Sequence, residues 1–299
     1  MAFANIVQTY EKNVKSILPM LWDICSETRH TLKPGLSTYS FPWAFGVPAL
    51  GYQPRMSLPD LLRFAHAHEV ERVQVGDNCP LHLLPPAEMD HLAQLALELG
   101  IQIEVGTRRL QIGQMKQYLD IARRFRSPFL RVVIDDQGYK PEVEQVCAII
   151  RELLPAFRDA GVILAIENHD RFPARVLREL IGDTDPTWVG ICLDTANSLG
   201  ANEGIQTVIE TLAPYTVNLH FKDIRIRRLP HLMGFRVEGC PAGKGTLDGP
   251  DLIAALNIHG HCQSVTLELW SSPLSSEAET LQQEHNWVLE SIRYVKTLL

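Results

Sequence analysis

The stretch that decides the fold is residues 142–167, EVEQVCAIIRELLPAFRDAGVILAIE, which predicts a helix followed directly by a buried strand. Apolar residues recur at helical spacing over Glu142–Ala160. Gly161 suits the left-handed conformation in which many helices end. The run Val162–Ile166 is apolar at every position, which is typical of a parallel strand that is covered on both faces. This stretch therefore predicts one helix–strand unit of an α/β protein.

The same alternation of strand and helix repeats along the chain, and Gly100 and Gly260 end helical stretches as Gly161 does. The expected strands are Leu36–Phe41, Arg72–Val75, Ile101–Val105, Leu130–Ile134, Val162–Glu167, Val189–Leu193, Val217–Phe221 and Ser264–Leu269. The expected helices are Leu58–His68, Ala87–Leu99, Met115–Phe125, Glu142–Ala160, Ala174–Ile181, Gln206–Leu212, Asp251–Ile258 and Ser276–Leu298. Eight strand–helix units in about 265 residues predict a (β/α)₈ TIM barrel, which typically takes about 250 residues.

An open, doubly wound sheet is the alternative arrangement of alternating strands and helices. It would favour a Gly-rich loop after the first strand, but residues 40–43 (SFPW) follow, and the motif G-x-G-x-x-G is absent. We therefore expect the whole chain, residues 1–299, to be a single barrel domain. Residues 1–34 are expected to form an N-terminal extension with an additional helix over residues 2–18.

Composition and charge restrict the class of protein. The chain has 299 residues, of which 45% are hydrophobic and 21% charged, a balance that is typical of a soluble globular enzyme and not of a disordered protein. Its 28 Lys and Arg against 35 Asp and Glu give a net charge of −7. This charge argues against nucleic acid or an anionic membrane as a general partner.

The sequence also bears on location. Every apolar run is far shorter than the roughly 20 residues of a membrane-spanning helix. Polar residues at positions 8, 11, 12 and 15 precede any apolar core of a signal peptide. The six cysteines form no C-x-x-C pair, so a zinc cluster is not expected. We therefore expect a reduced, cytoplasmic setting.

Residues of the types that bind metal ions, called metal-type residues below, lie at the ends of four consecutive expected strands, where TIM barrels carry their active residues. These are Glu167, Asp194, His220 and Glu268, each of which follows an apolar neighbour. For one such residue alone, an ion pair at a strand end is the simpler explanation. Three carboxylates in one buried space would repel one another, and each would cost several kcal/mol to bury without a partner. The four together predict a site for one divalent cation, Mn²⁺ or Mg²⁺ with Co²⁺ as an option.

The order Glu, Asp, His, Glu within the segments I-E-N-H, L-D-T-A-N and H-F-K-D resembles the xylose isomerase-like (sugar phosphate isomerase/epimerase) TIM barrel superfamily. That group includes ketose 3-epimerases, hydroxypyruvate isomerases, inosose dehydratases, sugar-acid decarboxylases and endonuclease IV. The resemblance covers residues 35–298. It implies that Glu167, Asp194, His220 and Glu268 bind the metal and that Glu167 and Glu268 are also catalytic. It further implies a role in carbohydrate metabolism and a homo-oligomer, either a dimer or a tetramer.

Two features bear on the reaction. The epimerase-like pattern has a His three residues after the aspartate of the sixth strand, where this chain has Asn197, and an amide binds a hydroxyl group but exchanges no protons with it. The loop after the seventh strand is basic, and its Lys222 and Arg225, nearest the strand end, are candidates for binding an anionic substrate. His169 is a further candidate for substrate binding. This loop and the segment L-D-T-A-N-S-L-G resemble the branch of 3-oxo-isoapionate decarboxylases.

These features predict a metal-dependent lyase that decarboxylates a 3-oxo sugar acid (3-oxo-isoapionate-like) through a metal-stabilised enolate. A ketose 3-epimerase or aldose–ketose isomerase, acting on a sugar or sugar phosphate through an enediolate, is the alternative, because both glutamates are kept. An endonuclease IV-like DNA repair enzyme is a distant alternative, since residues 76–79 and 106–109 lack the further histidines that it needs. A sugar-binding barrel without activity is the last alternative. The expected partner is a small sugar or sugar acid, with no nucleic acid and no membrane.

Overall fold

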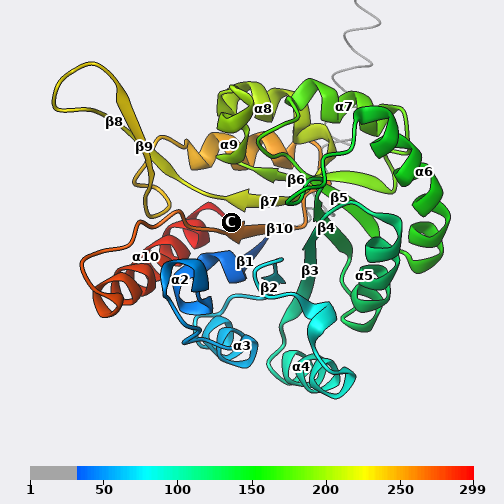
Figure 1. Ribbon diagram of the computed structural model, residues 1–299, viewed down its shortest axis with the longest axis horizontal. Helices are drawn as coiled ribbons and strands as arrows, with labels where there is room; N and C mark the ends of the chain where they lie inside the picture. Colours follow the sequence, from blue (N-terminus) through cyan, green and yellow to red (C-terminus); the bar gives the residue numbers. More distant parts are fainter. Residues whose placement is uncertain (1–31) are drawn as a thin grey trace, which may run out of the picture. The chain divides into compact units, whose positions relative to one another are not determined.

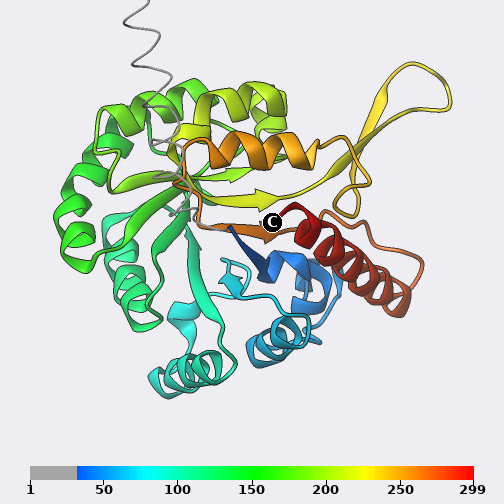
Figure 2. The same ribbon diagram turned by 180° about the vertical axis from the view of Figure 1, so that it is seen from behind.

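The computed structural model describes residues 32–299, in which parallel strands close into a barrel in the order β1-β10-β7-β6-β5-β4-β3-β2 (Figures 1 and 2). Because β1 pairs with both β2 and β10, the sheet has no free edge, which confirms the TIM barrel and excludes the open sheet. The barrel strands are β1 (Lys33–Ser37), β2 (Arg72–Val75), β3 (Gln102–Arg108), β4 (Phe129–Val133), β5 (Ile163–Glu167), β6 (Val189–Asp194), β7 (Thr216–Phe221) and β10 (Ser264–Leu267).

Helices surround the barrel and cover its outer face (Figure 1). They are α3 (Leu58–Ala67), α4 (Pro86–Glu98), α5 (Ile112–Arg124), α6 (Val143–Ala160), α7 (Ala174–Gly182), α8 (Ile205–Leu212), α9 (Gly249–Asn257) and α10 (Glu277–Leu298). Each begins and ends within three residues of its expected bounds. Gly161 at the end of α6 has a φ of 65°, as a left-handed helix end requires. Within residues 32–299, no helix is both long and apolar enough to span a membrane.

The first strand begins and ends earlier than expected. It begins at Lys33, inside the expected N-terminal extension, and ends at Ser37 instead of Phe41. Ser37 ends it because its hydroxyl accepts from the backbone N–H of Tyr39 and its own N–H donates to Ser40 Oγ, a capping box that starts a short 3₁₀ helix over Thr38–Ser40. The helix expected over residues 2–18 lies outside the described residues.

The basic loop after β7 contains a hairpin that the sequence analysis did not predict. Its strands, β8 (Ile224–Arg228) and β9 (Phe235–Gly239), are antiparallel and extend away from the barrel in both views (Figures 1 and 2). At its base, the carboxylate of Asp223 accepts hydrogen bonds from the backbone N–H groups of residues 224, 243, 245 and 247. Because the hairpin extends away from the barrel, its arginines at positions 227, 228 and 236 are exposed.

The last helix is joined to the segment after the first strand by a buried carboxyl group. Glu284 of α10 accepts hydrogen bonds from the N–H groups of Trp43 (2.8 Å) and Ala44 (3.0 Å) in α2 (Pro42–Phe45). Burial raises the pKa of Glu284 from 4.5 to about 7, although the two N–H donors partly oppose the shift. This contact therefore links α10, the last helix of the barrel, to α2, which follows the first strand.

The raised pKa of Glu284 predicts a pH-dependent stability. Between pH 4.5 and about 7, the folded protein binds more protons at this group than the unfolded chain does. Its contribution to the free energy of unfolding is therefore fully present below pH 4.5 and is lost as the pH rises through this range. Glu284→Gln removes the dependence. Urea denaturation should show wild type losing about 2 kcal/mol relative to this variant between about pH 5 and pH 8. A difference that does not change with pH would contradict this assignment.

Candidate active site

Four buried metal-type side chains meet at the carboxyl end of the barrel strands. Glu167 and Asp194 are the last residues of β5 and β6, His220 lies in β7, and Glu268 directly follows β10. His220 Nδ1 lies 3.5 Å from Glu167 Oε2, 3.8 Å from Asp194 Oδ2 and 3.4 Å from Glu268 Oε1. The structure thus brings all four residues together, because neighbouring parallel strands present their ends at the same mouth of the barrel.

Two atoms of this cluster lack hydrogen bonds. In the described part of the chain, the buried side-chain nitrogen and oxygen atoms without a hydrogen bond are His220 Nδ1 and Asp194 Oδ2, although the latter has an ion-pair contact with Lys222 Nζ at 2.8 Å. Buried polar atoms are normally paired. Two ligands of one Mn²⁺ or Mg²⁺ ion lie roughly 3–4.2 Å apart, given metal–oxygen distances of about 2.1 Å. The distances from His220 Nδ1 to the three carboxylates fall within that range, so these residues fit a divalent cation.

A chain of hydrogen bonds beneath the cluster fixes the ring of His220. Its Nε2 lies 2.6 Å from Gln74 Oε1, and Gln74 Nε2 donates to Asn218 Oδ1 at 3.1 Å. Asn218 Nδ2 donates in turn to Ser264 Oγ (2.8 Å) and Thr266 Oγ1 (3.0 Å). Because each amide oxygen accepts in this chain, His220 carries its proton on Nε2 when it is neutral and directs the Nδ1 lone pair at the carboxylates.

Cys192 lies within reach of Glu167 and His220 but differs from them chemically. Burial raises the pKa of the Cys192 thiol, and its Sγ donates to Asn218 Oδ1 at 3.1 Å. It therefore remains a thiol and acts as a donor. The ligand set that remains has three carboxylates and one imidazole, which suits Mg²⁺ or Mn²⁺ better than a thiolate zinc site.

Two cations of the chain also touch the cluster. Arg131 of β4 donates from Nε to Glu167 Oε2, and Lys222 Nζ lies 2.8 Å from Asp194 Oδ2 and 2.9 Å from Glu268 Oε2. Burial alone would lower the pKa of Lys222, but the carboxylates of Asp194 and Glu268 raise it above its ordinary value. Burial would raise the pKa of Asp194, yet Lys222 and His220 hold it below its usual range. Lys222 therefore neutralises much of the negative charge.

The other expected site residues differ in their relation to the cluster. Asn197 Nδ2 donates to Glu167 Oε1 at 2.8 Å, so this amide orients a carboxylate of the cluster. Arg225 donates to the carbonyl oxygen of Lys244 at the base of the hairpin. His169 Nδ1 lies 3.3 Å from Asp170 Oδ2 at the rim, with a partly exposed side chain. Substrate binding by these three residues stays a prediction.

A second polar group, which was not predicted from the sequence, lies at the same mouth, after β2 and β3. Asp77 accepts from Arg131 Nη1 at 2.9 Å through Oδ1, and from Arg108 Nε and the Tyr39 hydroxyl, each at 3.1 Å, through Oδ2. Burial would raise the pKa of Asp77, but the two arginines lower it to about 2. One signal was present in the sequence, because Arg131 is a charged residue in the middle of the otherwise apolar run of β4.

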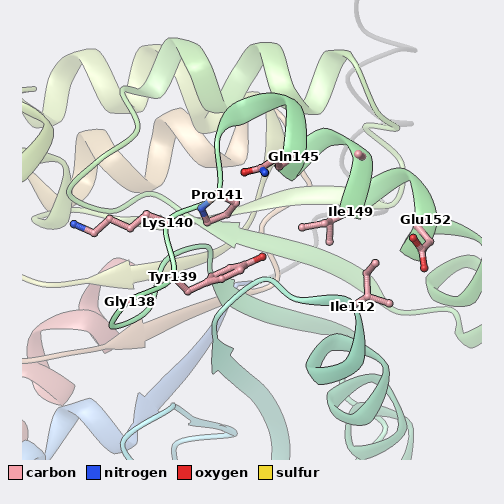
Figure 3. A pocket seen from close by; sticks show the side chains of 9 residues that line it. Ile112, Gly138, Tyr139, Lys140, Pro141, Gln145, Ile149 and Glu152 are labelled. Carbon is pink, nitrogen blue, oxygen red and sulfur yellow. The ribbon is translucent and has the colours of Figure 1, made fainter.

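A groove elsewhere on the molecule has no comparable cluster of carboxylate, imidazole and guanidinium groups. It has a volume of about 480 Å³ and lies between α5, α6 and the loop before α6 (Figure 3). Its only charged residues are Lys140 and Glu152, and it shares no residue with the cluster. The barrel mouth is therefore the candidate active site.

Comparisons with known proteins agree with this architecture. The family model described as "Xylose isomerase-like TIM barrel" matches residues 86–298. A 3-oxo-isoapionate decarboxylase of Pectobacterium atrosepticum is 32% identical over 264 residues, which cover 88% of this chain and 94% of that protein.

Solved structures with lower identity share the fold. A D-psicose 3-epimerase, 12% identical, superimposes with a TM-score of 0.65 over 89% of this chain and 98% of its own. A xylose isomerase-like TIM barrel protein from Mycobacterium smegmatis in complex with magnesium, 16% identical, superimposes with a TM-score of 0.64 over 90% of this chain and 99% of its own. From the barrel, the residues at its mouth and the matching family model, it follows that this chain belongs to the xylose isomerase-like TIM barrel family.

Proposed function

We propose that this protein is a divalent-metal-dependent, sugar-modifying enzyme that decarboxylates a 3-oxo sugar acid. The 32% identity to a 3-oxo-isoapionate decarboxylase over most of both chains supports the substrate class. The observation that carries the proposal is the unequal environment of the two glutamates at the barrel mouth, Glu167 and Glu268. Each accepts from one neutral donor and contacts one cation, but the cation at Glu167 is Arg131, which keeps its protons, whereas the cation at Glu268 is Lys222, which can transfer one.

Glu167, Asp194, His220 and Glu268 would hold the ion. Bound there, Mn²⁺ or Mg²⁺ supplies Lewis-acid stabilisation of negative charge on a substrate carbonyl oxygen. The three carboxylates with Arg131 and Lys222 carry one net negative charge, which a divalent ion turns into one net positive charge. A site with that balance suits a monoanionic sugar acid better than a neutral sugar.

The two glutamates differ in whether a neighbouring cation can transfer a proton. Both oxygens of Glu167 accept hydrogen bonds, one from Asn197 Nδ2 and one from Arg131 Nε, and neither donor transfers a proton at neutral pH. Glu268 accepts from Ser37 Oγ at 3.1 Å and lies 2.9 Å from Lys222 Nζ, so this pair holds a proton between two groups. Epimerisation needs a proton-exchanging group on each side of the substrate, whereas decarboxylation needs one proton donor.

The proposed reaction then proceeds in two steps. The bond between the carboxylate carbon and the adjacent carbon breaks, CO₂ leaves, and the electron pair forms a new carbon–carbon double bond while the 3-oxo oxygen becomes negative. The same adjacent carbon then takes one proton from the Lys222–Glu268 pair, which regains a proton from water. The products are a ketone and CO₂.

A ketose 3-epimerase or aldose–ketose isomerase is the second candidate. One observation favours it, namely that Glu167 and Glu268 both lie at the mouth beside the same imidazole of His220. Epimerisation or isomerisation would require Glu167 to exchange protons while it accepts hydrogen bonds from Asn197 and Arg131.

Removal of the lysine charge should strengthen metal binding. Lys222→Met removes a cation that lies within 3 Å of two ligand carboxylates, so we expect Mn²⁺ to bind about tenfold more tightly or better. Asp194→Asn should weaken binding, because it removes a charged ligand. Calorimetric titration of the metal-free proteins measures both effects. Lys244→Met is the matched control, since that lysine is exposed and lies near Glu290. Equal affinities for wild type and Lys222→Met would argue against an ion between these carboxylates.

The reaction itself can be tested directly. Wild type with Mn²⁺ and 3-oxo-isoapionate should release one CO₂ for each substrate consumed, and chelator-treated protein should release none. Glu268→Gln should lower kcat about 100-fold or more, because it removes one member of the proton-donating pair. Release of ¹³CO₂ from labelled substrate measures the rate. If D-fructose were instead epimerised with uptake of solvent deuterium, and no CO₂ appeared, the isomerase alternative would replace this proposal.

A further inference from the structure

Arg131 has a donor that the cluster does not use. The side chain is only 4% exposed, its Nε donates to Glu167, and its Nη1 donates to Asp77 and to the carbonyl oxygen of Thr107. No hydrogen bond joins Nη2 to any residue of 32–299, and Nη2 is also absent from the fully buried atoms that lack a partner. Nη2 is therefore not fully enclosed and keeps N–H donors that no described residue uses.

Arg108 offers further donors beside it. Its Nε donates to Asp77 Oδ2, while its two terminal amino groups make no hydrogen bond within the described chain, and its side chain is 33% exposed. Asp77 thus holds both guanidinium groups, one through each carboxylate oxygen, and the Tyr39 hydroxyl holds Asp77 in turn. With Glu167 counted, the two arginines and the two carboxylates that they contact are neutral, so this group offers a carboxylate ligand its unused N–H groups and no surplus charge.

We propose that Arg131 and Arg108, held by Asp77, bind the carboxylate group of the sugar-acid substrate beside the metal-type cluster. Planar guanidinium groups with fixed donors suit a carboxylate. The two residues that the sequence analysis assigned to an anionic substrate are engaged elsewhere, since Lys222 contacts Asp194 and Glu268, and Arg225 contacts a backbone carbonyl. This inference rests on the proposed function for the nature of the substrate.

The subsite has a kinetic consequence. Arg131 and Arg108 hold the carboxylate before its bond to the neighbouring carbon breaks, so they stabilise the bound substrate at least as much as the transition state. Loss of an interaction of this kind raises KM and leaves kcat nearly unchanged. A residue with a merely structural role would instead lower kcat or the amount of folded protein.

A pair of probes that differ in one group tests the subsite without turnover. D-Gluconate and D-glucitol have the same carbon chain, but one ends in a carboxylate where the other ends in a hydroxymethyl group. Calorimetry on Mn²⁺-loaded wild type should show tighter binding of gluconate. Arg108→Gln should weaken gluconate binding about tenfold and leave glucitol binding unchanged. Arg108 touches none of the metal-type residues, so this variant leaves the cluster intact.

The neighbouring arginine provides a control of equal charge. Arg109 lies over the ring of Tyr139 and 3.7 Å from Asp136, away from Asp77. Arg109→Gln should leave both affinities unchanged, which separates a local contact from the loss of net charge. Arg131→Lys keeps the positive charge but replaces the planar guanidinium, with its several fixed N–H donors, by a single ammonium group. It should also raise KM, and its Mn²⁺ affinity is measured separately because Arg131 contacts Glu167.

The outcomes separate this proposal from the decarboxylase assignment. Equal binding of gluconate and glucitol by wild type, or an unchanged gluconate affinity in Arg108→Gln, overturns the subsite. CO₂ release with the same KM in wild type and Arg108→Gln also overturns it while leaving the decarboxylase proposal in place. Selective gluconate binding that is lost in Arg108→Gln, in a protein that releases no CO₂, supports the subsite and overturns only the reaction.

Discussion

Repulsion among three buried carboxylates is the constraint on which the arrangement of the barrel mouth depends. Glu167, Asp194 and Glu268 all face one imidazole, so the surrounding residues must supply positive charge and donors. The backbone contributes, because Asp194 Oδ1 accepts from the N–H groups of Ala196 and Asn197, each at 2.8 Å. Asp194 Oδ2, on the same carboxylate, is left without such a donor. Each carboxylate thus contacts donors or cations of the protein while it also lies within 4 Å of the shared imidazole.

The same constraint divides the mouth into two sides. Strands β5, β6, β7 and β10 carry the acidic and imidazole groups, while β2, β3 and β4 lead to Asp77, Arg108 and Arg131. The two sides are linked by the contact of Arg131 with Glu167 and by the hydrogen bond between Gln74 of β2 and His220 of β7. One side of the mouth therefore presents carboxylate oxygens, and the other side presents guanidinium N–H donors.

Much of this arrangement could be predicted because it follows from local rules. Apolar runs and helical spacing fixed the positions of the strands and helices, and the rule that barrels act at strand ends singled out Glu167, Asp194, His220 and Glu268. Gln74 and Arg131 were missed because their meaning depends on which residues they face across the closed sheet. Sequence spacing does not encode those partners. The hairpin was missed because the loop was interpreted by its positive charge, although residues 224–227 (IRIR) and 235–238 (FRVE) alternate apolar and charged side chains as strands do.

That hairpin has a thermodynamic consequence. Its apolar side chains Ile226, Phe235 and Val237 are each 45–59% exposed, and Arg227 stands directly opposite Arg236. A two-stranded ribbon with so little burial is only marginally stable in water. Its base, however, is held by four backbone hydrogen bonds to Asp223. The ribbon can therefore unfold locally from its tip while the barrel remains folded. The chain thus has a less stable hairpin and a more stable barrel, and Asp223 lies at the boundary between them.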